Sequence, residues 1–343
     1  MKRAHAAETR GAGGQFRLDK RTNTVIAKDK PQPPSAETAR RIGERIAEIY
    51  ARSAIVGDDE QPHSLGGMSV PRDEGRFIAD LVRAEKPHAT LEIGMAWGVS
   101  TLFILQALFE NGAGFRPHVV MDPSQERIFH NAALRSLRDL AITETVEFYQ
   151  EPSELVLPRL VQEGRTFDLA FVDGNHHFDY VFTDLRFVHR LLRPGGLVIF
   201  DDTDWVGVNL TCSFAVANYG YRAVAEFSPD PDAPKQARPG TPPRARARAY
   251  RKPFEEIDPG ADAFAPFFLD FVPRELLEQM LRTEGRDLRH KGHMALRAGD
   301  RAQARNYLKL ALAHDPAHFK TFLRLLRTYL PHRVGRPGQT LRG

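Results

Sequence analysis

The segment Leu91–Thr101 reads LEIGMAWGVST, an apolar run that ends in a glycine-rich turn and leads into residues with helical spacing. Outward from it, short apolar runs alternate with amphipathic stretches whose apolar residues recur at helical intervals. The runs predicted as strands are Thr90–Ile93, His118–Met121, Thr145–Tyr149, Phe167–Val172 and Leu197–Phe200. This alternation predicts an α/β fold with a mostly parallel sheet covered by helices on both faces.

Further strands are predicted after these five. Tyr221–Phe227 has the pattern of a sixth strand, and the alternating Arg and Ala residues that lead into Ala249–Tyr250 predict a final edge strand that returns antiparallel. The alternative for Arg244–Lys252 is a solvated basic tract. We therefore expect a sheet of about seven strands.

The sheet does not account for the whole chain. Glycine, proline and charge at the start predict a flexible arm, Ser35 is a good helix N-cap, and the pattern turns helical again beyond Pro253. The predicted divisions are a flexible arm (1–34), an N-terminal helical segment (35–64), the sheet domain (65–255), a helical module (256–331) and a basic tail (332–343).

Composition narrows the class of protein. With 343 residues, 42% of them hydrophobic and 27% charged, the chain has ample material for a core, so global disorder is excluded. A lone cysteine, Cys212, excludes an internal disulfide framework and suits a reducing compartment. No apolar run approaches the ~20 residues of a membrane span, and the start lacks a secretory signal's apolar core. We expect a cytoplasmic protein, although Lys2 and Arg3 leave a transit peptide open.

Positive charge is concentrated near the C-terminus. Thr283–Gly343 holds 13 Lys and Arg against 4 Asp and Glu, so it carries +9; since the whole chain carries +4, the remainder carries −5. Such a segment can meet an acidic partner, or it can simply be a solvated helical face.

Two features at strand ends favour a nucleoside ligand. Gly94 and Gly98 follow the first strand, where glycine allows a close approach of the backbone and the next helix presents free N–H groups. Glu92 lies at the same strand end. Asp122 ends the second strand, where a carboxylate can accept both ribose hydroxyls. The alternatives are a tight strand–helix turn and a helix cap.

More carboxylates end the fourth and fifth strands. Asp173 follows one strand, and Asp201 and Asp202 follow the other, so neighbouring strands would bring them together around the hollow that holds Glu92 and Asp122. Without Lys or Arg among them, these three would repel one another. A divalent cation would relieve that repulsion, with Mg²⁺ expected before Mn²⁺ or Ca²⁺. Alternatively, Asp201 and Asp202 cap the following helix.

These motifs together resemble a known family. LEIGMAWGVST, Asp122 and FVDGNHHFDYVFTDLRFVHRLLRPGGLVIFDD are similar to the class I S-adenosylmethionine-dependent methyltransferases, in particular to the group with a D-G-x-H-x-Y motif that is related to metal-dependent, catechol-type O-methyltransferases. The resemblance covers about Gly66–Lys252. It implies a Rossmann-like methyltransferase sheet and S-adenosyl-L-methionine as cofactor.

The resemblance also implies roles for particular residues. Asp173, Asp201 and Asp202 fall on the relatives' metal ligands, although the relatives have Asn at the last position. His176 falls on their catalytic lysine and is the expected general base, with His177 in reserve; either histidine could instead bind the metal or be a hydrogen-bonded loop residue. The implied cofactor-binding residues are Glu92, Gly94, Met95, Ala96, Trp97, Gly98, Ser100, Thr101, Asp122, Ser153 and Asp173.

The predicted function is O-methylation of a hydroxylated small molecule or sugar, assisted by a divalent metal and a histidine base. The alternatives are a metal-independent methyltransferase that acts on oxygen or nitrogen, and a cofactor-binding scaffold without turnover. A nucleic-acid acceptor and a membrane are disfavoured. Gly292, Gly299–Asp300 and Leu308 match the spacing of one tetratricopeptide-like hairpin, which could support a homodimer or bind a protein partner.

Overall fold

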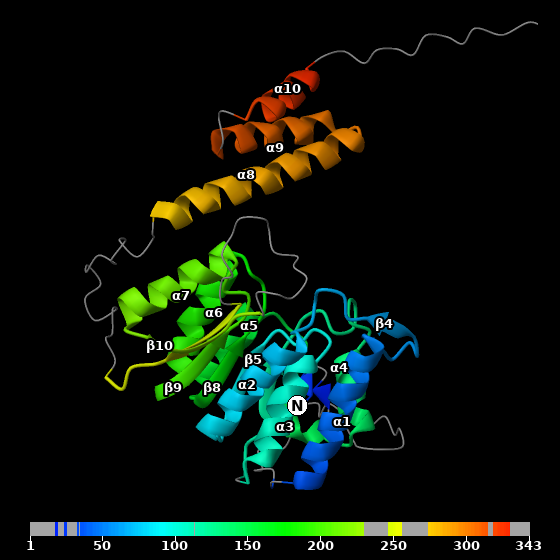
Figure 1. The fold of residues 1–343 in the computed structure, drawn as a ribbon, viewed down its shortest axis with the longest axis vertical. Helices are drawn as coiled ribbons and strands as arrows, with labels where there is room; N and C mark the ends of the chain where they lie inside the picture. The colour runs from blue at the N-terminus through cyan, green and yellow to red at the C-terminus, as the bar shows by residue number, and fades with distance from the viewer. Residues whose placement is uncertain are drawn as a thin grey trace, which may run out of the picture. The chain divides into compact units, whose positions relative to one another are not determined.

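The chain divides into two compact units, Met1–Phe271 and Val272–Gly343. In this computed structural model, the described residues are 18–19, 24–25, 33, 35–112, 114–229, 246–255, 274–314 and 318–329. The first unit is an α/β unit and the second is helical (Figure 1). Most of the predicted arm (1–34) and all of the predicted tail (332–343) lie outside the described residues.

A single large sheet organises the first unit, in the order β1-β2-β7-β6-β5-β8-β9-β11-β10. The pairs β7–β6, β6–β5, β5–β8 and β8–β9 are parallel, and the others are antiparallel. Its strands are β1 (Leu18–Asp19), β2 (Thr24–Val25), β5 (Thr90–Ile93), β6 (His118–Met121), β7 (Val146–Tyr149), β8 (Phe167–Val172), β9 (Leu192–Phe200), β10 (Arg222–Phe227) and β11 (Ala247–Arg251). The predicted mostly parallel α/β sheet is confirmed, with two short strands from the predicted arm added at one edge.

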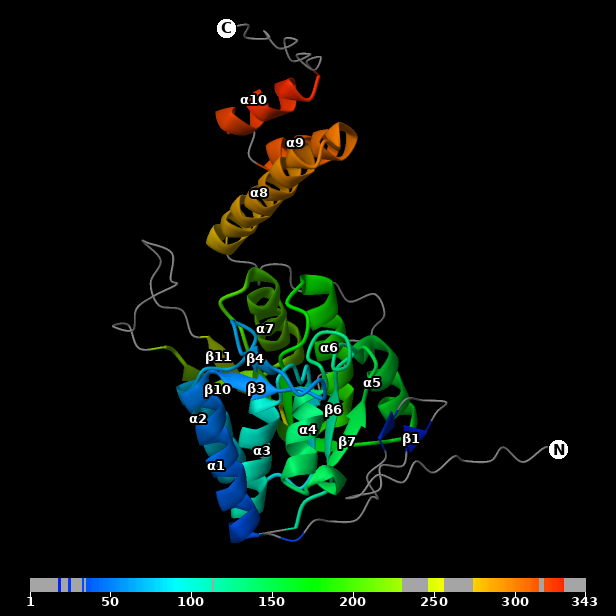
Figure 2. The ribbon, with the colours of Figure 1, turned by 90° about the vertical axis from the view of Figure 1, so that its right-hand side faces the viewer.

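Helices cover both faces of this sheet (Figure 2). Alternation along the strands explains why: Leu169 and Phe171 of β8 enter one apolar core, while Ala170 and Val172 enter the other. The first core is closed by α1 (Ala36–Arg52), α2 (Arg72–Glu85), α3 (Val99–Glu110) and α4 (Ala132–Asp139), and the second by α5 (Ser153–Gln162), α6 (Phe178–Leu191) and α7 (Val206–Tyr219). A 3-10 turn, Thr143–Thr145, precedes β7.

The expected edge position of Ala249–Tyr250 is wrong. Strand β11 lies between β9 and β10 and is antiparallel to both. Ala247, Ala249 and Tyr250 are buried, as an inner strand requires, whereas most side chains of β10 are exposed. The true edge strand of the described sheet on this side is therefore β10.

Two local features differ from the sequence pattern. A hairpin of β3 (Ala54–Val56) and β4 (Pro62–Ser64) forms a separate two-stranded sheet within the predicted N-terminal helical segment (35–64). The apolar spacing of Ile128–Leu140 predicts a helix, but the helix starts only at Ala132, because His130 and Asn131 adopt left-handed φ angles of 49° and 54°.

Asp168 joins the amino ends of three strands, opposite the end where ligands bind in such sheets. Its Oδ2 accepts the backbone N–H groups of His88 (2.7 Å) and Ala89 (2.9 Å), which precede β5, and its Oδ1 pairs with Arg193 of β9. Burial alone would raise the pKa of Asp168, but the hydrogen bonds from Ala89, Arg193 and His88 outweigh it and hold the pKa below its ordinary value.

Asp168→Asn should lower the free energy of unfolding at pH 7 by about 1–3 kcal/mol, the range for hydrogen bonds to a charged group. Because the folded pKa is depressed, this stabilisation is present above the unfolded pKa of about 3.9 and is lost as the pH falls through the folded pKa. Urea unfolding of both chains between pH 7 and pH 3 should show the difference shrinking. Asp179→Asn, at an exposed position on α6, is the control and should change stability by less than about 0.5 kcal/mol.

The second unit contains α8 (Arg274–Arg297), α9 (Arg301–His314) and α10 (Phe319–Arg327). Gly292 of α8 lies against Leu308 of α9, where a Cβ would come within 2.8 Å of the leucine side chain, and Ala304, Leu308 and Ala311 are fully buried. The predicted helical hairpin is therefore present, and its tetratricopeptide character stays a prediction. Among the described residues, the helices are too short or too polar to cross a membrane.

Candidate active site

The turn between β5 and α3 is built around two glycines. Gly94 has φ +88°, and a Cβ there would lie 2.0 Å from the carbonyl oxygen of Asp173, at the end of β8. Gly98, the N-cap of α3, has φ +77°, and its Cβ would lie 2.6 Å from that of Ala133. Both positions require glycine on steric and conformational grounds. The turn therefore lies tightly against the neighbouring strand end and presents the start of α3 beside it.

Glu92 is buried against α3 rather than exposed at the strand ends, and its predicted contact with a cofactor stays a prediction. Its side chain is fully buried and accepts hydrogen bonds from Ser100 Oγ (2.6 Å) and Thr101 Oγ1 (2.7 Å) on the first turn of α3. His118 Nε2 of β6 lies 2.8 Å away. Glu92 alternates with Leu91 and Ile93, and its face of β5 is the one that α3 covers. Glu92, Ser100 and Thr101 thus fix α3 to the sheet.

Asp122 lies at the end of β6, as predicted, but its carboxylate is occupied by protein donors. Oδ2 accepts the backbone N–H groups of Met95 (3.1 Å) and Ala96 (2.7 Å) and the side-chain amide of Gln125 (3.2 Å). Oδ1 accepts the N–H of Ser124 (2.7 Å). Asp122 therefore orients the glycine-rich turn, and a ribose would have to share or displace these donors.

The other predicted cofactor residues divide by burial. Gly94, Ala96, Ser153 and Asp173 are partly exposed, and the hydroxyl of Ser153 lies beside Asp184. Met95, Trp97, Gly98, Ser100 and Thr101 are buried, so this part of the turn lies inside the fold.

Asp173, His176 and Asp202 converge at the ends of β8 and β9. His176 Nε2 is 3.4 Å from Asp173 Oδ1 and 3.3 Å from Asp202 Oδ2. One potential ligand atom of each residue lies within 4.8 Å of the other two. The donor set of two carboxylate oxygens and one imidazole nitrogen fits a divalent cation. The predicted meeting of Asp173 and Asp202 is confirmed, and His176 completes the group.

Asp201 lies beside this group rather than within it, and its predicted role as a metal ligand stays a prediction. Its side chain is 1% exposed and faces Arg246, whose Nε is 3.6 Å from Asp201 Oδ1. Arg246 Nη2 is also 3.5 Å from Asp202 Oδ1, and its Nε is 2.6 Å from Glu74 Oε2. The expectation that Lys and Arg are absent from this group is therefore wrong: Arg246 neutralises part of the charge that a cation was expected to balance.

Burial and charge shift several pKa values here. Burial, followed by the proximity of Asp201, raises the pKa of Glu74 to about 10, so Glu74 is protonated at neutral pH. Burial and Asp201 likewise raise the pKa of Asp173 to about 8. Burial opposes protonation of His176, but its hydrogen bond to Asp173 and the charge of Asp202 raise its pKa above the ordinary value. The protonation of each of these groups therefore depends on the charge of its neighbours.

An exposed aromatic side chain lies beside His176. Trp205, which precedes α7, is 53% exposed, and its ring centroid is 5.1 Å from that of His176. His177 is exposed at the N-cap of α6 and makes no side-chain cap hydrogen bond. An apolar surface therefore adjoins the histidine that faces both carboxylates, while the other predicted histidine lies outside that group.

Glu74 and Arg246 were not predicted as site residues. Glu74 lies at the start of α2, and Arg246 directly precedes β11. Arg246 reaches the carboxylates because β11 pairs with β9, where Arg248 is opposite Phe200. The only signal in the sequence is the Arg/Ala alternation of that strand, which does not reveal its neighbour.

Comparison with known proteins agrees with this geometry. Residues 91–203 match a family model described as a methyltransferase domain. The match covers about a third of the chain. The predicted enzyme class, an S-adenosylmethionine-dependent methyltransferase, is thereby confirmed. The matched segment begins in β5 and ends just beyond Asp202, so it contains the glycine-rich turn and the carboxylate group.

The chain is also similar in sequence to proteins named as methyltransferases. Over 178 residues, 47% of this chain, it is 29% identical to a caffeoyl-CoA O-methyltransferase from Populus kitakamiensis, of which it covers 70%. It is 29% identical to a flavonoid 3',5'-methyltransferase from Vitis vinifera, over 41% of this chain and 57% of that protein. The crystal structure of an O-methyltransferase from Bacillus cereus in complex with SAH aligns with a TM-score of 0.46 at 17% identity, over 64% of this chain and 92% of that chain.

Proposed function

We propose that this methyltransferase transfers a methyl group from S-adenosylmethionine to a hydroxyl of a small aromatic or sugar-like acceptor. The observation that carries the proposal is the group of Asp173, His176 and Asp202 beside the exposed ring of Trp205. The named relatives support an oxygen acceptor, because those proteins are called O-methyltransferases of caffeoyl-CoA and of flavonoids. Trp205 offers a flat apolar surface on which an aromatic acceptor could stack.

In this proposal, His176 is the proton acceptor. Its Nδ1, the ring nitrogen that does not face the carboxylates, takes the proton of the acceptor hydroxyl as the oxygen attacks the methyl carbon; the new C–O bond forms, the S–C bond breaks, and S-adenosylhomocysteine leaves. Asp173 and Asp202 orient the imidazole and stabilise its protonated form. Glu74 and Arg246 hold Asp201 and Asp202 in place from the other side.

Asp173 and Asp202 are also the residues that would hold a divalent cation, with Mg²⁺ proposed first. Their partly exposed carboxylates converge, whereas Asp201 is engaged by Arg246. A bound cation would lower the pKa of the acceptor hydroxyl. Arg246 gives a specific reason to keep a metal-independent methyltransferase as the second candidate, because it already places positive charge beside Asp201 and Asp202.

The test combines cofactor binding with turnover. Calorimetry should show that S-adenosylhomocysteine binds the full-length chain, and mass spectrometry should show transfer of one methyl group to members of a panel of catechols, flavonoids, caffeoyl-CoA and sugars. EDTA should abolish turnover, and Mg²⁺ or Mn²⁺ should restore it.

Each component of the proposal can fail separately. Absence of cofactor binding would refute the methyltransferase proposal, and turnover that EDTA leaves unchanged would favour the metal-independent candidate. Cofactor binding without turnover of any acceptor would favour a scaffold. In that case, the helices of the second unit, proposed here to contact a protein partner or a second copy of the chain, would be the next part to test.

A further inference from the structure

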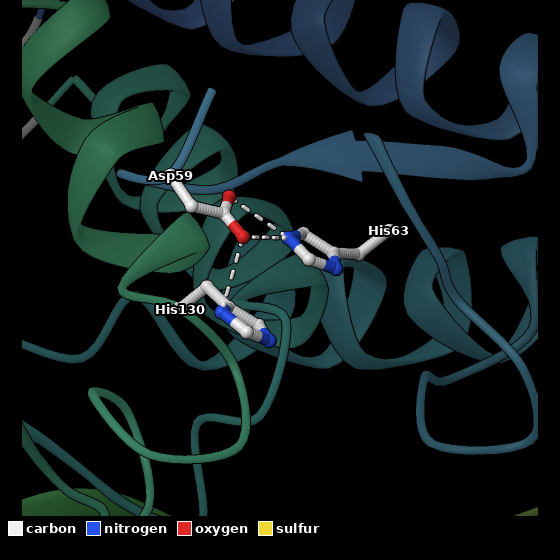
Figure 3. A group of neighbouring side chains, drawn as sticks. All are labelled: Asp59, His63 and His130. Carbon is white, nitrogen blue, oxygen red and sulfur yellow. Dashed lines mark hydrogen bonds and ion pairs between the residues drawn. The ribbon is translucent and has the colours of Figure 1, made fainter. Parts of the chain in front are cut away.

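A second group of potential metal ligands lies in the first unit, away from the carboxylates of the active site. Figure 3 shows one nitrogen of each imidazole ring, of His63 and of His130, facing the carboxylate of Asp59. His63 Nε2 is 3.0 Å from both Asp59 oxygens, and His130 Nδ1 is 3.2 Å from Asp59 Oδ2. A ligand atom of each residue lies within 4.8 Å of the other two. Two imidazole nitrogens thus lie against one carboxylate.

The backbone holds these side chains in place. Asp59 belongs to the turn of the β3–β4 hairpin, and the N–H of Asp58 donates to the carbonyl of His130 at 2.7 Å. Arg135 Nη1 of α4 donates to the carbonyl of Gly57 at 2.6 Å. At Gly57, a Cβ would come within 2.7 Å of His130 Cβ, so the two segments are in close contact. The cluster is therefore organised before any ion binds, which lowers the cost of binding one.

The imidazole rings are nearly parallel, with centroids 4.1 Å apart and an interplanar angle of 8°. One metal ion can satisfy a nitrogen of each neutral ring. The side chains of Asp59 and His130 are 37% and 41% exposed, which leaves an entry path and room for the carboxylate to move.

We propose that Asp59, His63 and His130 bind a borderline divalent metal ion, of which Zn²⁺ is the expected member. Imidazole nitrogens with a carboxylate suit Zn²⁺, Co²⁺ or Cu²⁺, whereas Mg²⁺ prefers an all-oxygen shell. Three protein ligands leave a fourth position for water. The site is distinct from the group of Asp173, His176 and Asp202 and does not depend on the proposed methyl transfer.

An ion bound by this cluster would lie close to the glycine-rich turn after β5. The ring of His63 stacks on Trp97 with centroids 5.8 Å apart, and Phe129 contacts the same indole edge-on at 5.0 Å. Trp97 Nε1 donates to the carbonyl of Leu65 at 3.1 Å. Trp97 belongs to the glycine-rich turn after β5, so an ion at the cluster would brace this turn against the β3–β4 hairpin.

The chain contains two tryptophans, and each is close to one of the two candidate metal sites. In a Trp205→Phe chain, only Trp97 remains, beside His63. Titration of this full-length chain with Cu²⁺, which binds such ligands most tightly and quenches nearby indole fluorescence, should give saturable quenching of Trp97. Added Zn²⁺ should displace Cu²⁺ and restore the emission. The same result is expected after His176→Ala, which removes the ligand nitrogen of the other site.

Two variants in the same background test the ligands. His130→Asn keeps a residue that tolerates φ 49° but removes the imidazole, and it should weaken Cu²⁺ and Zn²⁺ binding by at least about 100-fold, since even partners of ligands contribute about 10–100-fold. His290→Asn, at an exposed position of α8, is the matched control and should change nothing. If circular dichroism shows that His130→Asn is misfolded, Asp59→Asn takes its place. Quenching of Trp97 that survives in the folded variant, or that Zn²⁺ cannot reverse, would overturn the proposal.

Discussion

Gly94→Ala should lower the free energy of unfolding by more than about 4 kcal/mol and abolish binding of S-adenosylhomocysteine. A left-handed φ of +88° costs an alanine about 1–2 kcal/mol. The larger cost is steric, because the new Cβ would lie 2.0 Å from a backbone carbonyl oxygen, that of Asp173. No side-chain rotation relieves such a contact, so the ends of β5 and β8 must move apart. Urea unfolding and calorimetry measure the two effects.

Gly164→Ala is the matched control for this substitution. Gly164 also has a positive φ (+67°), but a Cβ there would meet no atom within 4 Å. It should therefore show the conformational cost alone, about 1–2 kcal/mol, with cofactor binding unchanged. Gly174→Ala is intermediate, since its nearest contact is a side-chain methyl of Ile93 at 3.1 Å. Equal losses for Gly94→Ala and Gly164→Ala would show that the close approach does not constrain the site.

The sheet could be predicted from the sequence because its central strands are buried on both faces. A run such as FDLAFV, at Phe167–Val172, has no polar alternation except Asp168, and the structure places it between two parallel neighbours. The position of β11 could not be predicted in the same way. A strand's neighbours are set by contacts distant in sequence, and Ala247–Arg251 has the same local pattern at an edge as between β9 and β10.

The sequence predicts the residues of the candidate site only where they directly follow a parallel strand. Residues that directly follow parallel strands meet at one edge of the sheet, and Asp173 and Asp202 do so. Glu92 lies within its strand, so alternation directs it to α3 instead. Arg246 and Glu74 enter from β11 and α2, and their approach depends on tertiary packing that no local motif encodes.

The pair of His63 and His130 illustrates the same limit. His130 lies in a segment predicted as a helix. A helical pattern does not predict which distant residues its side chain contacts. The left-handed conformation of His130 and Asn131 interrupts the predicted helix and brings the imidazole of His130 to the β3–β4 hairpin. Because the hairpin lies in a segment (35–64) predicted as helical, the sequence predicts a position for neither half of the cluster.

His176→Ala should lower kcat for methyl transfer by about 10²–10⁴-fold, the usual contribution of a positioned general base. Its imidazole is the group that both Asp173 and Asp202 face, at 3.4 Å and 3.3 Å, whereas the side chain of His177 is exposed at the N-cap of α6. The dissociation constant of S-adenosylhomocysteine should stay within about twofold, because the cofactor is not proposed to bind through this ring. Steady-state kinetics on an acceptor found in the panel, together with calorimetry, separates these effects.

The metal requirement distinguishes the two roles that His176 could have. If it is the base, the Mg²⁺ concentration that gives half-maximal rate should be unchanged in the variant, because Asp173 and Asp202 still hold the ion; if it is a ligand, that concentration should rise at least about tenfold. His177→Ala provides the comparison, with an expected loss in kcat of less than about threefold, since this exposed side chain lies outside the converging group. A larger loss for His177→Ala than for His176→Ala would transfer the role of base to His177 and refute the assignment made here.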